Sequence, residues 1–351
     1  MGEKSEQSLI QSFSRSSQPS WIDQLVRWIN TLSGPVWLYY VFGFLACVLL
    51  INAVFWIDGS MPVGSIHPVN SGFAIFIIYC IWLYNYLTKI GSQALKKFLP
   101  LLPMSEHDLA KVEYELEVLP RWIGRLMIPL GIGFAVINIL SESAPYEDIV
   151  PRTALPYIGD VVISGFLIST LFSLIIRSIR QLRMVRRLHA QAANIDLLKL
   201  EPAHAFSSLS ARTGIGIAMI LVIAFLIDPS SFDTKMSIIS TAVILILAIG
   251  IFVLPIIGIR DDLEEEKSRV LDGINDILNT SLTSLHDRLE KGDYQDVPAM
   301  EKGINALIQE RELYSRISTW PWDFRTLRSF ASTLLVPIFL LVISRLVERF
   351  F

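Results

Sequence analysis

Seven apolar runs, each at or near the length of a membrane-spanning helix, constrain this chain more than any other feature of its sequence. The hydrocarbon core of a bilayer is about 30 Å thick, and an apolar helix of about 20 residues crosses it. Hydrophobic residues make up 52% of the chain, charged residues make up only 18% and the mean hydropathy is +0.50, a combination unlike that of an ordinary soluble domain. We therefore predict an all-α, polytopic membrane protein with about seven spans. The predicted spans are residues 35–57, 72–89, 122–140, 157–176, 213–227, 236–258 and 329–344.

The fifth and seventh runs are the shortest. At 1.5 Å per residue they cover only about 22–24 Å of the hydrocarbon core. Arg212 flanks the fifth run, and Arg328 and Arg345 flank the seventh. Long basic side chains can extend toward the headgroups and compensate for a short span, so we keep both runs as spans.

The basic residues predict the orientation of the chain in the membrane. With a cytoplasmic N-terminus, only Arg152, Lys235, Arg345 and Arg349 lie outside, and the other 26 of the 30 Lys and Arg residues lie inside. The opposite orientation would place those 26 residues on the translocated side, against the positive-inside rule. We predict a multi-pass protein of the plasma membrane, of the bacterial inner-membrane type. Its N-terminus is cytoplasmic and its C-terminus lies outside.

These runs divide the chain into four predicted parts. The first twenty residues are rich in Ser and Gln and lack the apolar core of a signal peptide, so we expect a disordered tail without a cleavable signal. The predicted parts are a tail at 1–20, a membrane domain at 21–258, a cytoplasmic helical hairpin at 259–323 and a C-terminal span at 324–351.

Two amphipathic helices accompany the predicted membrane domain. Ser20 and Asp23 have the spacing of a capping box, and an apolar stripe follows them. We therefore predict an interfacial helix at 21–32, lying on the inner leaflet. A second helix is predicted at 105–118, packed under the bundle and bounded by prolines.

The fourth span continues as a basic helix beyond the membrane. Helix-forming residues follow it to about Ala193 without Gly or Pro. Five arginines on this extension can contact anionic headgroups at the inner interface, each contributing about 1 kcal/mol near the surface. The alternative is an ordinary stop-transfer anchor. The five are Arg177, Arg180, Arg183, Arg186 and Arg187.

Two stripes of apolar residues predict the cytoplasmic hairpin. Their spacing keeps each stripe on one helical face, and a polar break at 291–298 separates them. The stripes can pack on each other within one chain, or they can face a second copy or another protein. The predicted seam residues are Leu271, Ile274, Leu278, Leu282, Leu285, Leu289, Met300, Ile304, Leu307 and Tyr314.

Residues that could carry chemistry form no convincing site. Asp261, Asp262 and Glu265 have the DDxxE spacing of diphosphate-binding carboxylates, but no second acidic motif accompanies them. The helix dipole explains acidic residues in the first turn of the hairpin helix. Histidines are scattered without zinc or haem spacing, and we interpret Cys47 and Cys80 as packing residues within the first two spans. We expect no catalytic residues, no metal and no cofactor.

The function predicted from these features is non-enzymatic. The spans lack acidic, Lys and His side chains away from their ends, which argues against an ion-coupled carrier. We predict a membrane-anchored scaffold or signal transducer that acts through the cytoplasmic hairpin. The alternative is a homo-oligomeric ion channel with the hairpin as its gating stalk. The expected partners are anionic lipid and either a second copy or a cytoplasmic protein, with no nucleic acid.

The predicted topology is tested by single cysteines introduced at Ser65, Gln295 and Phe351, in a background without Cys47 and Cys80. Labelling of intact cells with an impermeant thiol reagent is expected at positions 65 and 351 and not at 295. Labelling at position 295 from outside would contradict the model.

Overall fold

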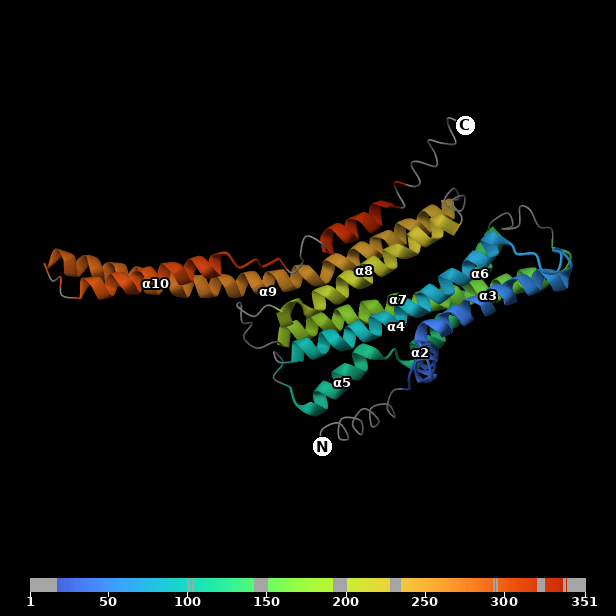
Figure 1. The fold of residues 1–351 in the computed structure, drawn as a ribbon, viewed down its shortest axis with the longest axis horizontal. Coiled ribbons are helices and arrows are strands. Elements are labelled where there is room, and N and C mark those ends of the chain that lie inside the picture. Colours follow the sequence, from blue (N-terminus) through green and yellow to red (C-terminus); the bar gives the residue numbers. More distant parts are fainter. Residues whose placement is uncertain are drawn as a thin grey trace, which may run out of the picture.

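The computed structural model describes residues 18–99, 102, 104–141, 151–191, 201–227, 235–292, 294, 296–320, 326–336 and 339. The described residues form helices and no strand, which confirms the predicted all-α class. Figure 1 shows the arrangement. The helices are α2 (Trp21–Thr31), α3 (Val36–Asp58), α4 (Pro68–Phe98), α5 (Glu106–Glu117), α6 (Arg121–Ser141), α7 (Leu155–Gln191), α8 (Glu201–Ile227), α9 (Lys235–Glu290) and α10 (Val297–Ser315).

Four helices contain described stretches that are long and apolar enough to cross a membrane. They coincide with the first, second, fourth and fifth predicted spans, and they support a membrane protein. The stretches are Val36–Asp58, Asn70–Phe98, Leu155–Val185 and Ser207–Ile227.

The helix that contains the fifth predicted span begins before that span. The predicted span begins at Thr213, directly after Arg212. Helix α8 begins at Glu201, and the Arg212 side chain on it is exposed. An arginine on the outer face of a helix therefore does not end the helix.

The other three predicted spans are described less completely. The run at 122–140 corresponds to α6, and the run at 236–258 falls in α9, where a shorter apolar stretch covers Thr241–Val253. Of the run at 329–344, only residues 329–336 and 339 lie within the described part of the chain. A total of seven spans therefore stays a prediction.

Local sequence signals explain where several helices begin and end. Ser20 caps α2, and Asp23 completes the predicted capping box. Ser105 caps α5 by accepting a hydrogen bond from the amide of Asp108, at 3.3 Å. The fourth predicted span continues as one helix to Gln191, in agreement with the absence of helix breakers after it.

The longest helix, α9, leaves the bundle and continues alone with α10. Figure 1 shows its first half beside α8 and its second half extending beyond the ends of α4 and α7. Lys267 donates hydrogen bonds to the carbonyls of Ser315 and Ile317, both at 2.7 Å, and Arg311 Nε donates to Asn275 Oδ1 at 2.8 Å. These pairs show that α10 runs antiparallel to α9. We call α10 and the part of α9 after Arg260 the stalk.

The α6–α7 contact depends on a glycine. A Cβ added to Gly131 would lie 2.6 Å from the carbonyl oxygen of Gly165 and 2.7 Å from the backbone nitrogen of Ser169. Real Cβ atoms do not approach a backbone this closely, so α7 packs directly on the backbone of α6. Gly133 on the same helix meets nothing within 4 Å.

We predict that Gly131→Ala destabilises the protein by about 1–3 kcal/mol, because α6 and α7 must separate to admit the methyl group. Gly133→Ala, the matched control, is expected to change stability little or to raise it slightly. The measurement is the midpoint of thermal unfolding in mild detergent. Equal midpoints for the two variants would contradict the close helix contact.

Candidate functional site

A buried carboxylate joins three separate segments near the middle of α4. Asp23 is 5% exposed, and Oδ1 accepts a hydrogen bond from the Tyr84 hydroxyl at 2.7 Å. Its Oδ2 accepts from the backbone amide of Leu119, at 2.9 Å, and from the Ser20 hydroxyl, at 2.7 Å. A single side chain thus connects α2 to α4 and to the link between α5 and α6.

A buried arginine lies beside this carboxylate. Arg177 is 3% exposed, and its Nη1 donates to the carbonyl of Tyr84 at 3.1 Å. Its guanidinium carbon lies 4.2 Å from the centroid of the Tyr84 ring, a cation–π contact. The Nε and Nη2 atoms have no hydrogen-bond partner within the described part of the chain. An incompletely paired buried cation is costly, which makes this position a functional candidate.

The five arginines predicted to contact lipid lie in different environments. Arg177 points into the bundle, so its side chain is shielded from headgroups. Arg180 is half-buried, whereas Arg183 and Arg187 are exposed. The side chain of Arg186 lies outside the described set. Lipid contact stays a prediction for the four arginines beyond Arg177.

A half-buried acidic side chain completes the polar cluster. Burial is the largest cause that raises the pKa of Glu117, and the neighbouring carboxylate of Glu113 raises it further. A hydrogen bond from Ser92 and the positive charges of Arg177 and Arg27 act in the opposite direction. Glu117 therefore ionises at a higher pH than an ordinary glutamate.

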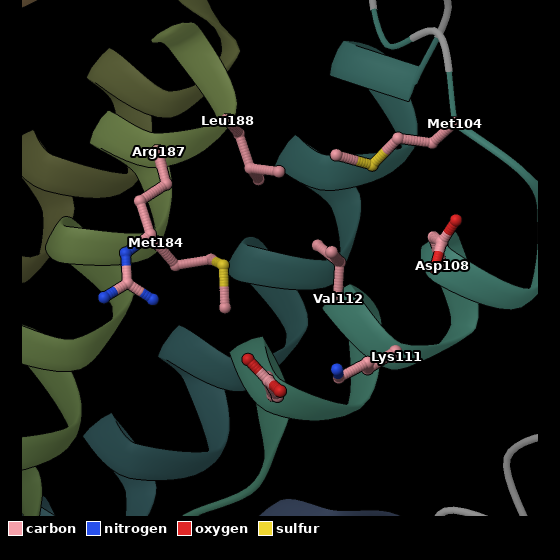
Figure 2. A pocket seen from close by; sticks show the side chains of 8 residues that line it. Met104, Asp108, Lys111, Val112, Met184, Arg187 and Leu188 are labelled. Atoms are coloured by element: carbon pink, nitrogen blue, oxygen red, sulfur yellow. The ribbon is translucent and has the colours of Figure 1, made fainter. Parts of the chain in front are cut away.

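A groove lies between α5 and the last turns of α7. Its volume is about 700 Å³, within the range of small-molecule sites. Figure 2 shows the side chains of Met104 and Val112 on one wall and those of Met184 and Leu188 on the other. Leu188 is buried and the other three are half-buried, so apolar side chains form part of each wall of the groove.

Charged side chains of both signs line the same groove. Asp108, Lys111 and Glu115 come from α5, and Arg187 comes from α7. The carboxylate of Asp108 already accepts a hydrogen bond from the Ser105 hydroxyl, at 2.7 Å. Neither Lys111 nor Arg187 forms an ion pair with another described side chain. The groove thus offers two available cations on opposite walls.

The predicted seam residues line the stalk. Ile274 and Ile304 are buried, at 6% and 7% exposure, and one lies on each helix of the stalk. Leu289 is exposed. The others are half-buried: Leu271, Leu278, Leu282, Leu285, Met300, Leu307 and Tyr314.

The DDxxE residues do not form a site in the described structure. Asp261 and Glu265 are exposed on α9, and the side chain of Asp262 lies outside the described set. Within the residues searched, no three His, Cys, Asp or Glu side chains are placed to hold a metal ion. Cys47 and Cys80 are free thiols in α3 and α4.

Comparison with known proteins does not identify the chain: no family model, curated protein or solved structure matches it. The site therefore has to be interpreted from its own geometry.

Neither the polar cluster nor the groove was apparent as a site from the sequence. Asp23 was assigned only a local capping role, although its partners Tyr84 and Leu119 lie 61 and 96 positions away. One wall of the groove does have a sequence pattern, since Asp108, Lys111, Val112 and Glu115 are spaced three apart or adjacent and share one face of α5.

Because the pKa of Glu117 is raised in the folded protein, we expect its ionisation to cost stability. As the pH rises from the ordinary range of glutamate through the raised pKa, the wild type should lose stability relative to Glu117→Gln. The variant is thus expected to unfold at a higher temperature at pH 8 and at the same temperature at pH 4. Glu310→Gln, which removes an exposed carboxylate on α10, is the control. A Glu117→Gln variant no more stable than wild type at pH 8 would contradict the assignment.

Proposed function

We propose that this protein is a non-enzymatic signal transducer or scaffold of the plasma membrane that acts through its stalk in the cytoplasm. The observation that carries the proposal is the continuity of α9, a single helix of 56 residues. At 1.5 Å per residue it is about 84 Å long, far more than a bilayer requires. One continuous helix therefore belongs to both the bundle and the stalk.

The base of α9 is firmly held in the bundle. Ala248 and Ile251 are buried in a cluster with Ile217 and Ala218 of α8. A Cβ on Gly214 of α8 would lie 2.9 Å from Cβ of Phe252, so the two helices pack closely. Movement of α8 relative to the rest of the bundle would carry the base of α9 with it.

The charge of the stalk supports its position in the cytoplasm, away from the membrane surface. Residues 261–316 contain 14 acidic and 7 basic residues. The inner leaflet of a plasma membrane carries a negative surface potential, which repels a segment of this charge. The basic residues near the inner ends of α4 and α7 are attracted to the same surface. We therefore place the bundle in the membrane, with the α9–α10 hairpin projecting into the cytoplasm.

The pairing of α9 with α10 is tested by two substitutions that differ in burial. Ile274→Asp places a charge in the buried seam and is expected to cost several kcal/mol or to separate the helices. Ile277→Asp, at a side chain that is 56% exposed, is expected to change stability by less than about 0.5 kcal/mol. Hydrogen exchange of the full-length protein in lipid should show faster exchange in α10 for Ile274→Asp alone. Equal protection of α10 in the two variants would contradict the pairing of α9 with α10 through this seam.

The same variants separate a transducer from a channel. Full-length protein in liposomes is expected to show no ion flux. Photo-crosslinking from Ile308 in native membranes is expected to capture a partner protein. The Ile274→Asp variant should lose this crosslink, and the Ile277→Asp variant should keep it. Ion flux that depends on an intact seam would instead establish the channel.

A further inference from the structure

We propose that the groove between α5 and α7 binds the headgroup of a zwitterionic aminophospholipid from the inner leaflet. The inference rests on the proposed function in one respect, because it treats this lipid as the signal that the protein reads. The binding itself is argued from the groove alone.

The phosphate would lie between Lys111 and Arg187. These cations come from opposite walls, both are exposed, and neither pairs with another described side chain. Arginine presents a planar set of donors that fits phosphate oxygens, and lysine adds a mobile point charge. Two cations that line one groove, neither in an ion pair with another described side chain, favour a phosphate ester over an uncharged ligand.

The acidic residues of the groove argue against a purely anionic ligand. Asp108 and Glu115 flank Lys111 at three and four residues along α5, so the four charged lining residues sum to zero. The Asp108 carboxylate already accepts a hydrogen bond from the Ser105 hydroxyl, whereas Glu115 makes no ion pair with another described residue. Glu115 is therefore the residue we assign to the ammonium group of the ligand.

The remaining lining residues suit the apolar part of a lipid. Met104 and Met184 face the groove from the two walls, as Figure 2 shows, with Val112 and Leu188 beside them. Thioether side chains are flexible and polarisable, and they adapt to irregular apolar ligands. A small hydrophilic phosphate ester would leave this surface uncovered.

The location of the groove favours a membrane lipid as the source. Only Val118, Leu119 and Pro120 separate α5 from α6. Near the start of α6, Trp122 is 66% exposed, and tryptophan is enriched at the membrane interface. The groove therefore opens close to the headgroup layer, within reach of long basic side chains.

The test measures binding of short-chain dihexanoyl lipids to full-length protein by native mass spectrometry. Dihexanoyl phosphatidylethanolamine is expected to bind wild type with a single saturable site. Lys111→Gln combined with Arg187→Gln should weaken binding about tenfold or more, because two charge-assisted contacts are lost. The matched control combines Lys96→Gln with Arg125→Gln, which removes two exposed cations from α4 and α6 outside the groove. It should change the Kd by less than about twofold.

A third variant tests the assigned role of Glu115. Glu115→Gln keeps both cations, and it should reduce the preference for dihexanoyl phosphatidylethanolamine over dihexanoyl phosphatidylglycerol. A purely structural role would leave that preference unchanged. All three proteins should unfold at the wild-type temperature without lipid, since the substituted side chains lie at the surface.

Three outcomes would overturn the proposal. Equal weakening by the groove and control variants would indicate general basic attraction, and tighter binding of phosphatidylglycerol by wild type would exclude a zwitterionic ligand. Free phosphoethanolamine binding as tightly as the lipid would identify a soluble ligand. None of these binding measurements involves the stalk. If lipid binding shows no specificity while the stalk variants behave as expected, only the lipid proposal fails. If the lipid binds specifically while the stalk variants do not behave as expected, only the proposed function fails.

Discussion

The carboxylate of Asp23 holds α2, α4 and the link before α6 together. It satisfies the Tyr84 hydroxyl and the Leu119 amide, two donors that would otherwise be buried without a partner. Each unsatisfied buried donor costs about 1–3 kcal/mol, so the contact fixes α2 against α4 and fixes the link that precedes α6. The position of that link determines where α5 lies, and α5 forms one wall of the groove. The groove thus depends on a residue that does not line it.

The features that sequence predicted well are those decided within a few turns of one helix. The Ser20–Asp23 capping box, the helix after Ser105 and the length of α7 follow from spacing and from the absence of helix breakers. Hydropathy found the apolar helices, but α8 begins at Glu201, twelve residues before the predicted span at 213–227, because an arginine on an exposed helix face does not end a helix.

The features that sequence could not supply depend on which faces of distant helices meet. Arg177 belongs to a regular basic stripe by spacing, yet it is buried against Tyr84, whereas Arg187 on the same helix is exposed. The two positions differ only in what packs on them. The groove is also not apparent along the chain, since the lining residues of its two walls lie more than 60 positions apart in the sequence. Our proposal connects these parts through α7, which carries Arg177 in the cluster and Arg187 in the groove.

The continuity of α9 also makes the stalk a lever arm. From Arg260, where the stalk begins, to Glu290 this part of α9 is about 45 Å long at 1.5 Å per residue. Tilting such an arm by about 7° at its base moves its tip sideways by about 5 Å, close to one helical pitch. A rearrangement among the packed helices can be too small to open a cavity. At the tip of the stalk, the same rearrangement would become a displacement large enough to exchange one set of side-chain contacts for another.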